Sequence, residues 1–402
     1  MEILLLGGTG VLSTDIAKIA LSMGHQVYLM NRGNRKERIA EGAVELVADI
    51  RSEESMQAAI KKNTWYVIID FLSFEPKDLE LKMRVFQNRC AQYVFISSAT
   101  AYHKKSEEEI ITEQTKIGGS NWYYANQKAL CEKALPQLAM RYNMQYTIVR
   151  PYVTYGETRI PFPIIPLTHQ WTLVNRILCG KPIIVVDGGN AVCTLTHTVD
   201  FAKNILGLLM NPEAYGEAFH ITSDETMTWK EVAFSIGNAV DKQPILVDIP
   251  MKVYVDIVPE DADILLYDKG TSMRFSNEKI KKISVGFSES IPFSEGIKKS
   301  VSFYKNHLEW QKISYEWDGL QDYAIEKYFG KKNLPADVSK RSISVYGYPY
   351  HLALREKVQY YIGRNNFLRC FVQRLQGIEH ILRVHLGKIK RKLKYSFRRK
   401  EY

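Results

Sequence analysis

Short apolar runs alternate with amphipathic stretches along the first 150 residues of the chain. The apolar runs predict strands, and the stretches between them, where apolar residues recur every three or four positions, predict helices. This alternation is typical of βαβ units around a parallel sheet. The predicted strands are Glu2–Leu6, Gln26–Met30, Val44–Val47, Tyr66–Asp70, Tyr93–Ser97 and Tyr146–Arg150, and the predicted helices are Thr14–Met23, Glu53–Lys61, Asp78–Cys90 and Asn126–Tyr142.

The same pattern continues with wider spacing to about residue 240. It predicts, in chain order, helix Trp171–Leu178, strand Pro182–Val186, helix Val199–Leu209, strand Ala218–Ile221 and helix Trp229–Val240. We therefore predict an α/β, Rossmann-type, doubly wound core over residues 1–160, to which residues 182–222 return. A smaller α/β substrate-binding region is expected over residues 161–305 and interleaves with the core. Residues 306–402 form a C-terminal extension, in which the aromatic-rich segment 307–350 predicts no particular fold.

The end of the chain combines an apolar stripe with many cations. From Leu368 to Leu393 apolar residues recur in steps of three and four, which predicts a basic amphipathic helix. Residues 381–402 hold nine Lys and Arg against one Glu, so residues 1–380 carry only about +2 of the net charge of +10. The tail over 368–402 suits an anionic membrane surface or a protein partner, whereas nucleic acid is a less favoured partner.

Other whole-chain features narrow the class of protein. Apolar residues make up 46% and charged residues 24% of the 402 positions, as in globular proteins. Neither a signal peptide nor a run of about 18 apolar residues is visible, so we expect a cytoplasmic protein, with peripheral attachment at the inner membrane surface as an option. The five cysteines include no CxxC pair, and neither a disulfide framework nor a metal site is expected.

A glycine-rich turn directly follows the first predicted strand. Gly7, Gly8, Thr9, Gly10, Val11 and Leu12 would let the backbone approach a pyrophosphate at a helix N-terminus. The second strand ends at Asn31 and Arg32, with Arg35 and Lys36 nearby, which favours NADP mildly over NAD; a solvated basic loop is the alternative. Asp49 and Ile50 end the third strand near the expected adenine. Further candidates for contact with the dinucleotide are Asp70, Phe71, Lys128 and Pro151.

A tyrosine and a lysine four residues apart suggest acid–base chemistry. Tyr124 and Lys128 would share one helix face, where an ammonium and an oxidised nicotinamide could lower the pKa of the phenol towards neutral pH. Ser98 ends the preceding strand, so its hydroxyl could share a substrate oxygen with Tyr124. The alternative is a capping serine and an ordinary surface pair.

These motifs together resemble the extended short-chain dehydrogenase/reductases of the nucleotide-sugar epimerase/dehydratase kind. The resemblance covers about residues 1–305 and includes Arg150-Pro151, Thr196–Asp200 and Ser272–Ser276. Asn31–Gly33, Trp122-x-Tyr124 and Arg159–Pro161 resemble an atypical branch that includes chloroplast stem-loop RNA-binding relatives. The resemblance implies that Tyr124 is the acid/base, that Lys128 binds the nicotinamide ribose and that Ser98 holds the substrate hydroxyl.

The chain departs from the family pattern at two places. Ala99 and Thr100 follow Ser98 where a 4,6-dehydratase has acids, so we expect dehydration to be disfavoured. Cys193 stands where many members have an arginine that clamps the nucleotide diphosphate. Replacement cations would be Arg159, Arg176 and Arg274, which we predict to bind substrate together with Ser98 and Thr100. Glu132 is expected to pair with Lys128, four residues before it.

The leading hypothesis is an NAD(P)-dependent epimerase or ketoreductase of a nucleotide-linked sugar in polysaccharide biosynthesis. Hydride would pass between a sugar carbon and the nicotinamide, while Tyr124 takes or returns the hydroxyl proton. Epimerase and reductase share these motifs and are not separated by them. The alternative is a catalytically retired scaffold that binds RNA or a protein. A homodimer through Asp78–Cys90 and Asn126–Tyr142 is also consistent with the resemblance.

Overall fold

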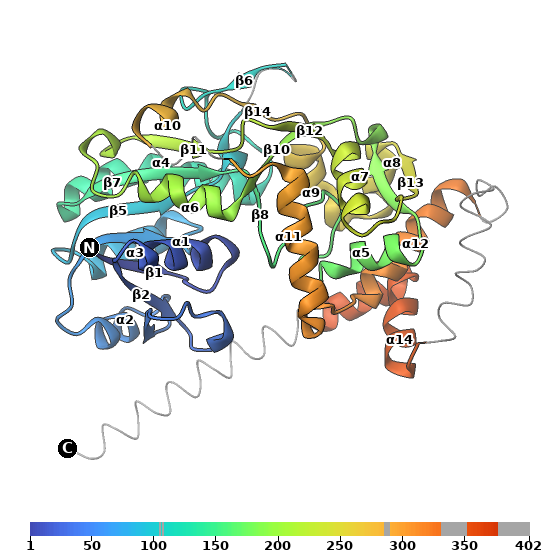
Figure 1. The fold of residues 1–402 in the computed structure, drawn as a ribbon, viewed down its shortest axis with the longest axis horizontal. Helices are drawn as coiled ribbons and strands as arrows, with labels where there is room; N and C mark the ends of the chain where they lie inside the picture. The colour runs from blue at the N-terminus through green and yellow to red at the C-terminus, as the bar shows by residue number, and fades with distance from the viewer. Residues whose placement is uncertain (104–105, 107, 285–289, 331–351, 377–402) are drawn as a thin grey trace, which may run out of the picture.

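The core of the protein is a parallel sheet of seven strands. The structure is a computed structural model that describes residues 1–103, 106, 108–284, 290–330 and 352–376. The strand order is β11-β7-β5-β4-β1-β2-β3 (Figure 1), and each neighbouring pair is parallel. The strands are β1 (Glu2–Leu6), β2 (Gln26–Asn31), β3 (Val44–Val47), β4 (Trp65–Asp70), β5 (Cys90–Ile96), β7 (Gln145–Pro151) and β11 (Ala218–Ile221).

Helices cover both faces of this sheet, as the near-continuous apolar strands require. One face packs against α1 (Val11–Ser22) and α6 (Thr198–Leu206), and these two helices also pack on each other. The other face packs against α2 (Glu53–Ile60), α3 (Pro76–Val85) and α4 (Tyr123–Tyr142). The predicted Rossmann-type fold is therefore confirmed. The predicted helix Asp78–Cys90 is too long at its end, because α3 ends at Val85 and Cys90 already begins β5.

The second half of the chain forms smaller sheets beside the core. Sheet β12-β10-β8 consists of β8 (Val153–Tyr155), β10 (Val192–His197) and β12 (Thr226–Thr228). β9 (Ile183–Val186) pairs with β13 (Leu246–Ile249), and β6 (Ile110–Ile111) pairs with β14 (Arg274–Phe275). Helices α5 (Trp171–Leu178), α7 (Trp229–Ala239) and α11 (Phe293–Asn306) contribute to the apolar cluster of this region.

The chain returns to the core later than the sequence indicated. We expected residues 182–222 to return as a unit, yet β9 pairs outside the core sheet and β10 pairs with β8. Within residues 182–222 it is α6 and β11 that join the core, over residues 198–221, and α10 (Glu278–Ile283) packs on the same cluster later in the chain. The apolar strand Ile183–Val186 has the same pattern in either sheet, and its sequence therefore cannot indicate which partner it takes.

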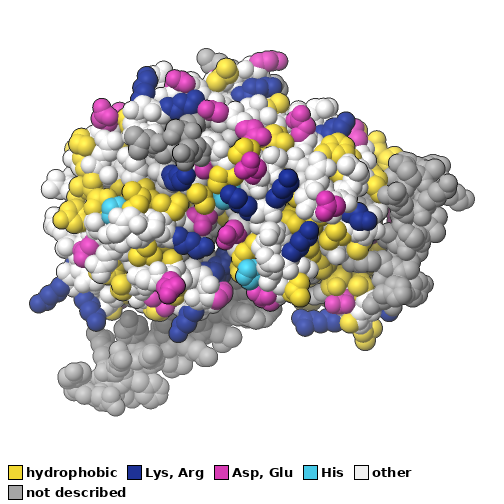
Figure 2. Space-filling model, in the orientation of Figure 1, with side chains coloured by type: hydrophobic (Ala, Val, Ile, Leu, Met, Phe, Trp, Pro, Cys, Tyr) yellow, Lys and Arg dark blue, Asp and Glu magenta, His cyan; other side chains and the backbone are white. Residues whose placement is uncertain are grey.

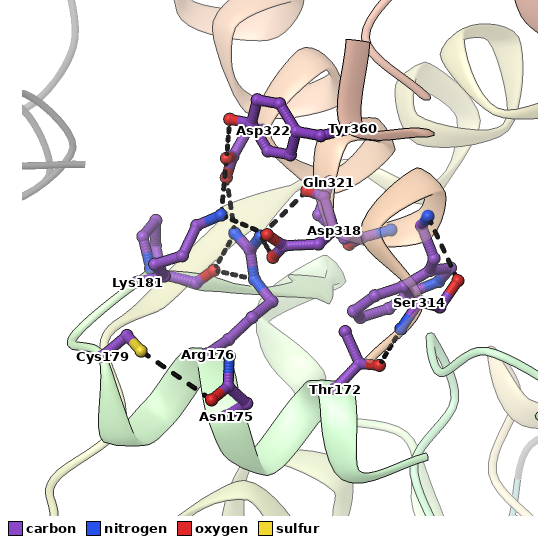
Figure 3. A network of polar contacts seen from close by, with 12 residues as sticks. Thr172, Asn175, Arg176, Cys179, Lys181, Ser314, Asp318, Gln321, Asp322 and Tyr360 are labelled. Carbon is purple, nitrogen blue, oxygen red and sulfur yellow. Dashed lines mark hydrogen bonds and ion pairs between the residues drawn. The ribbon is translucent and has the colours of Figure 1, made fainter. Parts of the chain in front are cut away.

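Part of the C-terminal extension is held to α5 by a buried ion network (Figure 3). α12 (Tyr315–Phe329) and α14 (Leu354–Gly363) pack on each other, and α12 also packs on α5 and α8 (Met251–Ile257). Arg176 of α5 contacts Asp318 at 2.5 Å and Asp322 at 2.9 Å, and Lys181 contacts the same two carboxylates at 2.6 and 2.8 Å. Tyr360 of α14 donates to Asp322 at 2.6 Å, so the network joins both helices to α5.

The remaining predictions about the tail lie mostly outside the described residues. The structure describes neither residues 331–351, which include Tyr346–Tyr350, nor residues 377–402, which include the basic segment 381–402. On the face shown in Figure 2, basic and acidic side chains are interspersed, in keeping with the small net charge of residues 1–380. Within the described part, no helix combines the length and the apolar character that crossing a membrane requires.

Candidate active site

The glycine turn between β1 and α1 has a shape that would let a ligand come close to the backbone. Gly7 has φ +96°, and a Cβ there would lie 2.7 Å from Leu72; a Cβ on Gly8 would lie 2.5 Å from Leu29. Ser13 closes the turn, because its hydroxyl accepts from the Gly10 amide at 2.9 Å and donates to the Gly7 carbonyl at 2.8 Å. No acid occupies the first turn of α1, which leaves its N-terminus favourable for an anion.

A cavity of about 520 Å³, here called the glycine-turn cavity, opens beside this turn. Asn31 lines it: its Oδ1 accepts from the Gly33 amide at 2.6 Å, while its Nδ2 is buried without a partner among the described residues. A ribose hydroxyl would satisfy that donor. The residues present therefore fit a dinucleotide. The predicted residues that line this cavity are Gly7, Thr9, Gly10, Asn31, Arg32, Asp49 and Ile50.

Asp70 differs from its predicted role. Its carboxylate accepts from the Leu72 amide at 2.8 Å and from Tyr93 at 2.7 Å, lies 3.3 Å from Lys82, and also accepts from Ser73. Burial opposes this charge, but Lys82 and the hydrogen bonds outweigh it and lower the pKa of Asp70. Asp70 lines neither of the two cavities at this edge of the sheet, so its contacts fix the loop after β4 and leave no free oxygen for a cofactor.

A second cavity of about 300 Å³, here called the tyrosine cavity, lies at the carboxyl ends of β5 and β7. Phe74 lines both cavities, which makes them neighbours. The predicted residues Leu12, Phe71, Ser98, Thr100, Tyr124, Lys128, Pro151 and Arg159 all line it. Of the other predicted cofactor residues, Gly8 packs behind the turn on Leu29, and Val11 lines a separate groove.

Ser98 and Tyr124 meet inside the tyrosine cavity. Ser98 follows β5 and Tyr124 is in the first turn of α4, and both side chains line this cavity. The Ser98 Oγ also accepts from the Thr100 amide at 3.3 Å and from the Thr100 hydroxyl at 2.9 Å. Thr100 therefore orients Ser98, and the pair of hydroxyls is placed to bind one substrate oxygen.

The Lys128 side chain is hydrogen-bonded to the backbone at the edge of the tyrosine cavity. Its ammonium is buried and donates to the carbonyls of Ser73 and Ile96, each at 2.8 Å. Desolvation lowers the pKa of Lys128 to about 8. Burial raises the pKa of Tyr124, while the Ser98 hydroxyl and the Arg159 charge oppose that rise. The positive charge of Arg159 therefore favours the Tyr124 phenolate, while the predicted effect of Lys128 on this phenol stays a prediction.

The expected pairing of Glu132 with Lys128 is wrong. Glu132 accepts from Arg150 Nε at 3.0 Å, pairs with Arg150 Nη2 at 2.5 Å and also accepts from Ser97. Both partners are buried, so the pair fixes the ends of β5 and β7 beneath the cavity. An i,i+4 spacing gives proximity on a helix surface, but here Glu132 faces the sheet.

The three candidate arginines have different surroundings. Arg159 lines the tyrosine cavity and, among the described residues, has no ion pair. Arg176 is fully buried in the network of Figure 3, with its guanidinium bound by Asp318, Asp322 and the Pro182 carbonyl, so its predicted substrate role is wrong. Arg274 lies in β14 beside β6 and lines neither cavity. Cys193 is buried, with its thiol near the Met227 carbonyl.

The sequence analysis missed several residues that line the tyrosine cavity. Asp268 and Lys269 come from a π-helical turn, η6 (Leu265–Lys269), and Tyr152 and Phe74 come from loops after β7 and β4. In the sequence, Asp268 and Lys269 are two adjacent charged residues with no recognisable motif around them. Only the fold brings this turn to the cavity that Tyr124 of α4 also lines, so no local signal marked it.

A parallel sheet in this order, with a glycine turn and adjoining Ser, Tyr and Lys, defines the extended short-chain dehydrogenase/reductase class. The sequence model of the NAD dependent epimerase/dehydratase family matches residues 3–222. The chain belongs to this family, and the resemblance seen in the motifs is confirmed.

Curated relatives are distant and differ in their named activities. The chain is 24% identical to the chloroplast stem-loop binding protein of 41 kDa b from Arabidopsis thaliana over 258 residues, which are 59% of this chain and 63% of that protein. It is 23% identical to the mouse dTDP-D-glucose 4,6-dehydratase, over 59% of this chain and 62% of the other. A Streptomyces kanamyceticus 2'-dehydrokanamycin reductase is 22% identical, over 66% and 74%. The chain spans less than two thirds of the length of the stem-loop binding protein and of the mouse dehydratase.

Solved structures share the fold at low sequence identity. The UDP-glucose 4-epimerase of Thermus thermophilus in complex with NAD has a TM-score of 0.61 and 17% identity, with 76% of this chain and 100% of that chain covered. The UDP-glucuronic acid 4-epimerase of Bacillus cereus, in complex with UDP-glucuronic acid and NAD, has a TM-score of 0.62 and 13% identity, with 76% and 99% covered.

Proposed function

We propose that this protein transfers hydride between a carbon of a nucleotide-linked sugar and a bound nicotinamide dinucleotide, as an epimerase or a ketoreductase. The observation that carries the proposal is the meeting of Ser98 and Tyr124 in a cavity that adjoins the glycine-turn cavity. A substrate oxygen held by both hydroxyls would lie where a proton can move to or from Tyr124.

The residues of the chain divide the work as follows. The glycine turn and Asn31 would hold the dinucleotide, which supplies the hydride acceptor or donor when bound. Tyr124 takes the proton of the sugar hydroxyl in the oxidising direction and returns it in the reducing direction. Ser98 binds the same oxygen, and Arg159 favours the phenolate. Lys128 uses two of its three donors on backbone carbonyls, so one remains for a ribose hydroxyl.

Native mass spectrometry of the purified protein tests the proposal most directly. Tightly held NAD would favour epimerisation, because the hydride must return to the same sugar. Exchangeable NADPH would favour a ketoreductase. A protein that binds no dinucleotide would contradict the proposal and favour a retired scaffold. The name of the Arabidopsis relative motivates RNA binding as that second candidate, but the placement of Ser98 and Tyr124 in one cavity favours catalysis.

The choice between the two dinucleotides depends on the cations beyond β2. Arg32 and Arg35 are exposed and line the glycine-turn cavity, and the Asn31 side chain brings no negative charge that would repel a 2′-phosphate. We expect the double variant Arg32→Ala, Arg35→Ala to bind NADPH about 10- to 100-fold more weakly and NADH about equally well, because only NADPH offers a phosphate to these cations. Fluorescence titration of both dinucleotides measures this.

The variant Lys36→Ala is the matched control, because it removes a nearby positive charge that does not line the cavity. It should leave both affinities nearly unchanged. Equal weakening of NADH and NADPH by the double variant would contradict the preference for NADP, and it would leave NAD as the cofactor.

We also propose that the end of the chain attaches the protein to an anionic lipid surface. The helical segment 366–376 exposes Phe367, Phe371 and Leu375, with Phe367 76% exposed, and the sequence beyond it is strongly basic. Exposed aromatic side chains together with cations are typical of interfacial attachment. A homodimer through α3 and α4 stays a prediction.

Replacing Phe367 and Phe371 by serine is expected to reduce binding to phosphatidylglycerol vesicles by about tenfold or more, because the variant lacks the two apolar rings that would enter the lipid. Vesicle flotation measures it, with phosphatidylcholine vesicles as the uncharged comparison. Leu167→Ala, which removes another exposed apolar side chain far from this helix in the sequence, should change nothing. Unchanged flotation of the double variant would contradict lipid attachment through this helix.

A further inference from the structure

An unpartnered carboxylate lies in the tyrosine cavity. Asp268 is 5% exposed, and its Oδ1 has no hydrogen-bond partner among the described residues. The hydroxyl of Tyr152, which lines the same cavity, is also buried without a partner there. Burying a polar atom without a partner destabilises a fold, so such atoms are expected where a ligand supplies the missing contact.

The charges around Asp268 do not neutralise it by contact. Lys269 is adjacent on the same turn and Arg159 lines the same cavity, but neither lies within ion-pair distance of the Asp268 carboxylate among the described contacts. Burial therefore dominates and raises the pKa of Asp268 to about 6, with Lys269 opposing the rise. The other titratable groups that feel its charge are Tyr124 of α4, Tyr152 after β7 and Cys193 of β10.

The backbone holds Asp268 rigidly. The Gly270 amide donates to the Leu265 carbonyl at 2.9 Å, and the Trp229 indole donates to the Lys269 carbonyl at 2.8 Å. A Cβ on Gly270 would lie 2.3 Å from the Leu265 carbonyl oxygen, so the turn closes tightly at that point. π-helical turns are rare and recur at functional sites. The carboxylate therefore sits on a fixed element facing the cavity that Ser98 and Tyr124 also line.

We propose that Asp268 selects the sugar: its free oxygen accepts a hydrogen bond from a ring hydroxyl other than the one that reacts at Tyr124, and Tyr152 contacts the same part of the ring. This inference rests on the proposed function. An ionised carboxylate accepts hydrogen bonds but donates none, so it fits a hydroxyl group and rejects a carbonyl or carboxylate at that point. The substrate class is therefore a sugar that carries a free ring hydroxyl in addition to the reacting group.

The variant Asp268→Asn tests this by calorimetric titration with UDP-glucose, UDP-glucuronic acid and UDP. Loss of a charge-assisted hydrogen bond should weaken binding of the sugar nucleotides by about 10- to 100-fold. Binding of UDP, which has no sugar beyond the diphosphate, and of the dinucleotide should stay within about twofold. Asp263→Asn removes an exposed acid from the neighbouring helix and is the matched control, with no change expected in any affinity.

The stability of the Asp268→Asn variant distinguishes a ligand-binding role of Asp268 from a structural role. Because the folded-state pKa of Asp268 lies above the usual 3.8, the folded state loses stability as pH rises from about 4 through 6. Asp268→Asn should therefore lower the unfolding equilibrium constant at pH 7 by roughly 10- to 100-fold, and this gain should vanish at pH 4. A structural carboxylate would show the reverse, a less stable variant.

The binding results distinguish a failure of the Asp268 role from a failure of the proposed function. If the unaltered protein binds both sugar nucleotides and Asp268→Asn binds them equally well, the role of Asp268 is overturned and the proposed function stands. If the variant loses UDP and sugar nucleotides alike, Asp268 acts on the diphosphate side, and the inference is also overturned. If the unaltered protein binds no sugar nucleotide, the proposed function fails and this inference fails with it.

Discussion

Replacing Tyr124 by phenylalanine is expected to reduce turnover by about 10²- to 10⁴-fold, the range for loss of a positioned acid or base. In the proposed function the phenol reaches a substrate oxygen beside Ser98, and phenylalanine keeps the ring contacts with Trp122 and Phe74. Affinity for the dinucleotide should stay within about twofold, because Tyr124 does not line the glycine-turn cavity. Hydride transfer measured by nicotinamide absorbance, and dinucleotide binding measured by titration, check the two parts.

The neighbouring Tyr123→Phe is the natural control. Tyr123 is exposed and donates to Glu75 at 2.9 Å, on the outside of the same helical turn. Its loss should leave turnover nearly unchanged. If Tyr124→Phe retained full turnover, Tyr124 would be removed from the reaction, and the proton would have to travel by another route.

Removing Arg176 should destabilise the protein by about 3–5 kcal/mol, the usual effect of deleting one member of a buried ion pair. Arg176→Met leaves Lys181 as the remaining cation beside the buried Asp318 and Asp322, with Tyr360 still donating to Asp322 (Figure 3). Burial opposes the Asp322 charge, but Lys181 and Arg176 outweigh it and lower the pKa of Asp322 well below its usual range. The network therefore contributes stability at neutral pH that is lost as pH falls into the acid range.

Chemical denaturation of the full chain measures this effect, and limited proteolysis shows whether α12 and α14 become accessible. Arg141→Met is the matched control, because Arg141 forms an exposed pair with Glu80 at 2.7 Å and such pairs contribute little. A free energy of unfolding for Arg176→Met equal to that of the control would contradict the assignment of this network as the attachment of the C-terminal helices.

The parts of this molecule that the sequence predicted are those with local causes. β1, the glycine turn and α1 follow each other within 22 residues, and their patterns depend on nothing distant. Tyr124 and Ser98 were found because each lies next to a recognisable element boundary. The Arg176 prediction failed because its partner Asp318 is 142 residues away, and no spacing rule reaches that far.

The tyrosine cavity illustrates the same limit. Glu132 appeared to be a surface partner of Lys128, yet its partners Arg150 and Ser97 come from β7 and the end of β5. Asp268 gave no signal at all, because its chemistry arises from burial. A carboxylate indicates a binding site only when the fold buries it away from water and supplies no hydrogen-bond partner in place of the water.

The late return of α6 and β11 has a consequence for synthesis on the ribosome. Strands β1 to β7 are complete at residue 151, but apolar residues such as Val94, Ile96 and Val149 on one side of the sheet pack in the cluster that also contains Phe201 and Ile205. A nascent chain of 151 residues would therefore expose this surface to solvent until roughly 70 more residues emerge, a few seconds or more at typical elongation rates. Chaperone capture during that interval, and failure of a fragment ending near residue 160 to fold alone, both follow from the order in which the sheet is covered.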